Sequence, residues 1–177
     1  MDPSPTLLPP SDSMRILVTG HRPQKLGGFG PSPVQASVRA WLREQLLRAQ
    51  SPAWTLTALS GMALGVDQWF AEEALALGLP LWAFVPFEGQ ENLWPAASQT
   101  HYRTLLARAA HRTIVSTGGY APHKMQRRNE AMVDQAVLCL AVWDGSPGGT
   151  ANCVAYATHR RVPIRRLNPL TLEVTDG

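Results

Sequence analysis

The sequence contains no apolar run of the roughly 20 residues that a membrane-spanning helix requires, and only 16% of its 177 residues are charged. Residues 1–13 are rich in Pro and Ser but have no basic segment ahead of an apolar stretch, so we expect a disordered leader there and no secretion signal. Cysteine is scarce: Cys139 and Cys153 are too few for a disulfide scaffold, and we expect both to be reduced and buried. These absences exclude a transmembrane protein and predict a cytoplasmic one.

Several enzyme motifs are missing as well. The sequence has no Gly-x-Ser-x-Gly elbow, no Walker A loop and no dinucleotide fingerprint after its first apolar run. Its net charge of +3 permits anionic partners but does not require a nucleic acid. No metal site is expected, because four histidines lack the mutual spacing of metal ligands. These are His101, His111, His123 and His159.

Two kinds of apolar segment alternate along the chain. Residues 14–20 form a continuous apolar and β-branched run that ends in Gly, which is typical of a strand buried on both faces. Residues 34–49 instead carry apolar side chains at helical spacing. The same alternation predicts six strands, at 14–20, 54–59, 80–85, 112–116, 137–143 and 162–167, and five helices, at 34–49, 66–77, 98–109, 123–136 and 151–158.

This alternation, with short connections, predicts a Rossmann-like α/β fold. We expect a single doubly wound, mostly parallel sheet with helices on both faces. The domain should span residues 14–168 and be followed by a C-terminal tail at 169–177. Right-handed crossovers place the strand-to-helix loops at one edge of such a sheet, where ligands bind.

A glycine turn near residue 148 is one candidate ligand site at that edge. Gly148, Gly149 and Thr150 leave an apolar strand and open a helix, whose N-terminus favours an anion such as phosphate or pyrophosphate. Thr150 could also act as the N-cap. The same residues would equally suit a tight, well-capped turn without a ligand, so both interpretations stay open.

A second turn and the first loop add polar groups to the edge. Ser60, Gly61 and Gly65 precede the second helix, and Asp67 lies in its first turn, where it could bind a ribose hydroxyl or an arginine or complement the helix dipole. The first strand ends at a cationic loop, which makes an anion site plausible. This loop contributes Gly20, His21, Arg22 and Lys25.

The helix at 123–136 has a polar pair on its inner side. Asn129 falls on the apolar stripe and Arg128 lies on its flank, where its guanidinium is a candidate phosphate clamp. The helical phase turns Arg127, Glu130 and Asp134 toward solvent, and we expect them to form i,i+3 and i,i+4 pairs.

Together these motifs resemble those of the SLOG superfamily. The resemblance rests on TGHRP (19–23), SGMALGVD (60–67), PF (86–87) with Glu91 and Trp94, RNEAMVD (128–134) and GGT (148–150). It covers residue 14 to about residue 167 and is closest to the YpsA-like branch of uncharacterised proteins. The superfamily unites DprA-type DNA-processing proteins with Lonely-Guy-type phosphoribohydrolases, in which a homodimer is usual.

The resemblance implies a nucleotide or nucleotide-derived ligand, bound by a sensor, a carrier or an enzyme. In the Lonely-Guy pattern an Arg and a Glu serve the N-glycosidic cleavage of a nucleoside monophosphate. Arg128 matches that Arg, but Asn129 stands where Lys is usual and residues 151–153 offer no carboxylate in place of the Glu.

Three alternatives remain open. One is a phosphoribohydrolase in which Glu88, Glu91 or Asp67 replaces the missing Glu, with Arg128 as the remaining catalytic candidate. Another is a DprA-like single-stranded DNA-binding protein, which needs a basic groove with exposed aromatic side chains. The six tryptophans are mostly at positions typical of a core, with Trp94 as the exception. The last is a molybdenum-cofactor carrier.

Overall fold

The computed structural model describes residues 12–177. The predicted leader at 1–13 lies almost entirely outside these residues, and Ser13 already belongs to the first strand. All the predicted strands and helices are present, with ends shifted by a few residues. The strands are β1 (Ser13–Gly20), β2 (Thr55–Ser60), β3 (Leu81–Phe87), β4 (His111–Ser116), β5 (Leu138–Val142), β6 (Ile164–Leu167) and β7 (Val174–Asp176). The helices are α1 (Pro33–Ala49), α2 (Val66–Ala76), α3 (Ala96–Ala107), α4 (Pro122–Val133) and α5 (Gly149–His159), with a short 3-10 helix, η1 (Pro23–Lys25).

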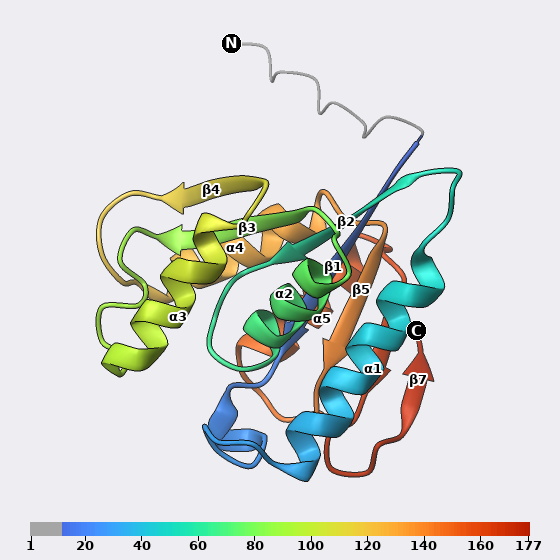
Figure 1. The fold of residues 1–177 in the computed structure, drawn as a ribbon, viewed down its shortest axis with the longest axis horizontal. Helices are drawn as coiled ribbons and strands as arrows, with labels where there is room; N and C mark the ends of the chain where they lie inside the picture. Colours follow the sequence, from blue (N-terminus) through green and yellow to red (C-terminus); the bar gives the residue numbers. More distant parts are fainter. Residues whose placement is uncertain (1–11) are drawn as a thin grey trace.

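The strands form one sheet in the order β4-β3-β2-β1-β5-β6-β7 (Figure 1). All neighbouring pairs are parallel except β6 and β7. The chain winds from β1 outward to β4 and then returns to place β5 on the other side of β1. The fold is therefore the predicted Rossmann-like α/β sheet, and its winding direction reverses between β1 and β5.

Helices cover both faces of the sheet. α1, α2 and α3 lie on one face and α4 and α5 on the other (Figure 1). A separate hydrophobic core lies on each face: the first packs against α1, α2 and α3, and the second packs against α4 and α5. Successive β1 side chains point to opposite faces, so Ile16 and Val18 belong to the first core and Leu17 belongs to the second. All three are fully buried, which explains the uninterrupted apolar run in the sequence. Cys139 and Cys153 are free and buried in the second core, as expected.

The predicted tail at 169–177 contains a strand, β7, that the sequence pattern does not predict. β7 pairs antiparallel with β6, and Ile164 and Gly177 exchange two backbone hydrogen bonds of 2.8 Å. Arg165 Nε donates to Asp176 Oδ1 at 2.7 Å. Every β7 side chain is exposed, so no apolar alternation marks this strand in the sequence.

The burial of the tryptophans differs in part from what the sequence suggested. Trp41 and Trp69 are buried, but Trp54 is 39% exposed. Trp94 is half-buried, since its ring packs edge-on against Tyr102 with centroids 5.4 Å apart. Trp94 was expected outside the core, whereas it packs against the core. Within residues 12–177, no helix is long and apolar enough to cross a membrane.

Candidate functional site

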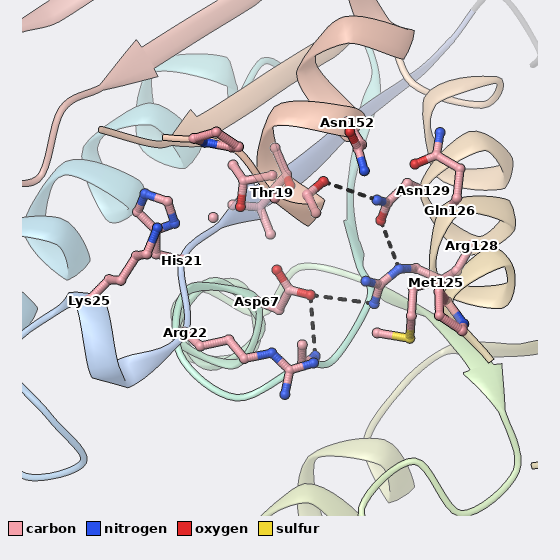
Figure 2. A pocket seen from close by; sticks show the side chains of 18 of the residues that line it. Thr19, His21, Arg22, Lys25, Asp67, Met125, Gln126, Arg128, Asn129 and Asn152 are labelled. Carbon is pink, nitrogen blue, oxygen red and sulfur yellow. Dashed lines mark hydrogen bonds and ion pairs between the residues drawn. The ribbon is translucent and has the colours of Figure 1, made fainter. Parts of the chain in front are cut away.

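A pocket of about 540 Å³ lies at the carboxyl ends of β1 and β5, where the winding of the sheet reverses (Figure 2). Its walls come from the loop after β1, the start of α2, one side of α4 and the N-terminus of α5. Ligands of open α/β sheets bind at this switch point. The volume also falls within the range of about 300–1,000 Å³ that is usual for small-molecule sites.

The N-terminus of α5 opens into this pocket. Gly148 is the N-cap, with a φ of 142° that favours glycine, and among the described residues no side chain caps the helix. Thr150 is therefore not the N-cap, as the sequence had suggested, because α5 already begins at Gly149 and Thr150 lies within its first turn. Helix geometry leaves the N–H groups of residues 149–151 without intrahelical acceptors, so this end of the pocket suits an anion.

Arg128 reaches from α4 across to the turn between β2 and α2. Its Nη1 donates to the carbonyl of Gly61 at 2.7 Å, and its Nε donates to Asn129 Oδ1 at 3.0 Å. Nη1 also lies 3.6 Å from Asp67 Oδ2 (Figure 2). Arg128 lines the pocket, although only 6% of the residue's surface is exposed. Arg128 is therefore held by protein groups as well as available to a ligand.

Asp67 is the carboxylate on the facing wall. It is 6% exposed, lines the pocket and accepts the N–H of Ala63 at 3.2 Å. Burial raises the pKa of Asp67, and the charge of Arg128, the Ala63 N–H and the charge of Arg22 each oppose that rise. Of the roles that the sequence left open, the structure shows pairing with an arginine.

Three of the candidate ligand residues build the turn and do not line the pocket. Ser60 Oγ donates to the Asp67 carbonyl at 2.8 Å and accepts the Met62 N–H at 3.1 Å. A Cβ on Gly61 would lie 1.9 Å from Arg128 Nη1, and one on Gly65 would lie 2.7 Å from the carbonyl of His21. These small residues therefore permit close packing of the turn against its neighbours.

On the opposite side, a side-chain hydrogen bond joins the loop after β1 to the loop after β5. His21 Nε2 lies 2.7 Å from Asp144 Oδ1 and 3.2 Å from the backbone nitrogen of Asp144. Asp144 Oδ1 also accepts the Ser146 N–H at 2.9 Å and the Ser146 hydroxyl at 2.5 Å. Lys25 Nζ donates to that hydroxyl oxygen at 2.5 Å. The Ser146 bonds, with a smaller contribution from His21, hold the pKa of Asp144 well below its usual range.

The carboxylates considered as substitutes for the missing Glu lie in different places. Glu88 is exposed, and Glu91 is buried with Arg103 Nε 3.2 Å from its Oε1. Neither residue lines the pocket. Asp67 is therefore the acidic side chain that the structure brings to the site.

The inner side of α4 agrees with the predicted helical phase. Arg128 and Asn129 are buried, whereas Arg127 is exposed. Asn129 Nδ2 donates to the Gly149 carbonyl at 3.4 Å and so connects α4 to α5. The expected pairs of Arg127 were wrong: packing against α5 pairs Asp134 with Arg160 at 3.0 Å, and Gln126 Nε2 donates to Glu130 Oε1 at 3.1 Å.

Several pocket residues were not anticipated from the sequence. Asp144 does not line the pocket but bonds to Ser146, which does. It follows a buried strand immediately before the glycine turn, and this position was a usable signal. Tyr120 lies in a polar loop without periodicity, so nothing in the sequence marked it. Other unanticipated lining residues are Gln24, Met125, Gln126 and Asn152. In residues 12–177 no group of three or more His, Cys, Asp or Glu side chains is placed to hold a metal ion.

Curated proteins of bacteria are similar in sequence to this chain. The uncharacterized SPbeta prophage-derived protein YoqJ of Bacillus subtilis (strain 168) is 35% identical over 97 residues, which cover 48% of this chain and 57% of YoqJ. UPF0398 protein OB1025 of Oceanobacillus iheyensis is 28% identical over 146 residues, which cover 76% of this chain and 77% of the relative. This chain thus matches little more than half the length of YoqJ.

Solved structures share the fold. DNA processing protein A (DprA) from Streptococcus pneumoniae superposes with a TM-score of 0.65 at 16% identity, covering 88% of this chain and 50% of DprA. DprA from Helicobacter pylori, whose structure concerns a single-stranded DNA binding mode, gives 0.60 at 16% identity, covering 88% of this chain and 65% of that one. Residues 16–171 match the family model YpsA, described as the YspA SLOG family. The chain belongs to this SLOG family.

Proposed function

We propose that this protein binds a nucleotide or a nucleotide-derived ligand in the pocket between β1 and β5, with a phosphate at the N-terminus of α5. The observation that carries the proposal is the uncapped helix end, which faces a cavity of about 540 Å³. Arg22 and Lys25 are exposed and line the same cavity, so its rim is cationic. Membership of the SLOG family supports a nucleotide-related role.

Hydrolysis of the N-glycosidic bond of a nucleoside monophosphate is a second candidate function. It is favoured by one observation, that Asp67 lines the pocket and that burial raises its pKa. A carboxyl group with a raised pKa retains a proton to higher pH and can then act as a general acid toward a leaving base. Asp67 is also paired with Arg128, so we place ligand binding first and cleavage second.

Substitution of Gly149 by Asp tests the phosphate position. A Cβ on Gly149 meets no atom within 4 Å and its φ is not in the left-handed region, so the variant should fold. The new carboxylate would stand beside the helix N-terminus and repel an anion. We expect Gly149→Asp to weaken binding of AMP and ADP-ribose at least tenfold by calorimetry, since hydrogen bonds to charged groups contribute about 1.5–3 kcal/mol.

Gly30→Asp is the matched control, because Gly30 is exposed, has open space around it and does not line the pocket. Equal affinities of wild type and Gly149→Asp for both ligands would refute the phosphate assignment. Chromatography of wild-type samples incubated with AMP reports on the second candidate. Release of adenine that Asp67→Asn abolishes would move cleavage ahead of simple binding.

A further inference from the structure

Tyr120 is a large aromatic side chain that lines the pocket while remaining mostly in water. It lies between β4 and α4 and is 70% exposed. Its ring meets Phe87 edge-to-face, with centroids 6.0 Å apart and planes at 78°. Phe87 thus supports Tyr120, but the burial it provides is too small to explain the residue by core packing. An exposed aromatic ring at the rim of a pocket is available to stack on a planar group.

The neighbours of Tyr120 make this end of the pocket apolar. Pro122 and Met125 follow it on α4 and also line the cavity. Figure 2 shows Met125 beside Arg128 on the α4 wall, across the cavity from Arg22 and Asp67. The thioether of Met is polarisable and makes favourable contacts with aromatic rings. Pro122 and Met125 therefore add apolar surface beside Tyr120, against which a flat group can pack.

The length of α4 separates the apolar end from the anion end. Asn129 bonds to the Gly149 carbonyl at the N-terminus of α5, whereas Pro122 begins α4 next to Tyr120. Seven residues of helix rise by about 10 Å. This separation is comparable to the span from the 5′-phosphate to the base of one nucleotide.

We infer that Tyr120 is the stacking platform for the nucleobase of a mononucleotide whose phosphate binds at the N-terminus of α5. The inference rests on the proposed function and adds the direction in which the ligand lies, with its base toward the start of α4 and its sugar beside Asp67 and Asn129. Stacking on an aromatic ring tolerates different bases, because each of them has a π-face. Tyr120 therefore favours ligands that carry a nucleobase but does not distinguish one nucleobase from another.

The test compares a ligand that has the ring with one that lacks it. AMP and ribose 5-phosphate are titrated by calorimetry into wild type, Tyr120→Ala, Tyr120→Phe and the control Phe29→Ala. Phe29 is 59% exposed, follows β1 and does not line the pocket. Base–aromatic stacking is typically worth about 1–3 kcal/mol, so Tyr120→Ala should weaken AMP binding about 5- to 150-fold. Ribose 5-phosphate affinity should stay unchanged, and Tyr120→Phe and Phe29→Ala should bind AMP like wild type.

The outcomes separate this inference from the proposed function. If wild type binds AMP and ribose 5-phosphate equally well, the stacking platform is refuted while the anion site stands. If Tyr120→Ala weakens both ligands to the same extent, the residue acts on the pocket as a whole, and the inference is again refuted. If wild type binds neither ligand, the mononucleotide site fails and the inference fails with it. The inference is supported if Tyr120→Ala, and neither of the other two variants, loses affinity for AMP while keeping its affinity for ribose 5-phosphate.

Discussion

Two adjacent arginines on α4 illustrate how far one position on a helix changes the role of a side chain. Arg128 is buried, contacts the Gly61 carbonyl and Asn129, and faces Asp67 at 3.6 Å. Arg127, one residue earlier, is exposed. The two residues have the same charge and the same local sequence, so the difference arises from the helical phase.

We predict that Arg128→Ala destabilises the protein far more than Arg127→Ala does. Removing Arg128 leaves Asp67 buried without its partner, which costs about 3–5 kcal/mol in comparable buried pairs. A surface substitution such as Arg127→Ala usually changes stability by about 0.5 kcal/mol or less. Urea unfolding of both variants measures the difference.

The double variant Arg128→Ala/Asp67→Asn provides the control for the cause. If the loss comes from the stranded carboxylate, neutralising Asp67 should restore part of the stability. The two side chains are not coupled if Asp67→Asn lowers the stability of the Arg128→Ala variant by as much as it lowers the stability of wild type.

At the scale of elements, the pocket depends on two loops that the chain brings together from either end of the fold. The loop after β1 and the loop after β5 are joined through His21 and Asp144, which are 123 residues apart. Ser146 and Lys25 extend the contact to the segment just before α5. The N-terminus of α5 is thereby positioned by an ionised carboxylate.

We predict that Asp144→Asn destabilises the protein at neutral pH and that this effect becomes smaller in acid. The folded state holds the pKa of Asp144 below its unfolded value, so the stabilisation is complete above an unfolded pKa of about 3.9 and is lost as pH falls toward the folded pKa. Thermal unfolding at pH 7, 5 and 3 should show a difference of about 1–2 kcal/mol at the first two values and a smaller one at the third.

Asp134→Asn is the matched control, because Asp134 forms an exposed pair with Arg160 and should contribute about 0–1 kcal/mol. The interpretation of Asp144 would be wrong if the gap between wild type and Asp144→Asn stayed constant or widened as pH fell.

At the scale of the whole molecule, the shared fold with DprA raises the question of DNA binding. A single-stranded DNA site needs a cationic groove with aromatic side chains along it. The net charge is only +3, and the exposed Trp54 precedes β2, at the opposite edge of the sheet from the pocket. Tyr120 is thus separated from this tryptophan by the length of the strands.

We therefore predict little binding of single-stranded oligonucleotides at physiological salt. Any binding at low salt should weaken as salt rises, with a logarithmic slope of about −0.7 for each phosphate contacted. Fluorescence anisotropy of a labelled oligonucleotide measures both quantities. A sub-micromolar dissociation constant at physiological salt would place DNA binding ahead of a small-molecule role.

Residue patterns were enough to predict the type and order of the elements up to β6. Apolar residues in continuous runs or at helical spacing depend on local geometry alone, so strands such as β1 and helices such as α4 could be placed without knowledge of the fold. The convergence of parallel strand ends also brought His21, Asp67 and the Gly148–Thr150 turn to one edge, and the helical phase turned Arg128 inward. β7 escaped prediction because none of its side chains is buried.

The partners of these groups, in contrast, depend on tertiary packing. Arg128 binds a carbonyl 67 residues away, and neither periodicity nor spacing specifies which buried acceptor a guanidinium meets. The tertiary structure likewise assigned Ser60, Gly61 and Gly65 to the packing of a turn, and it brought Tyr120 to the pocket from an irregular loop. Local sequence patterns report which face of an element is buried, whereas contacts between distant segments depend on how the elements pack.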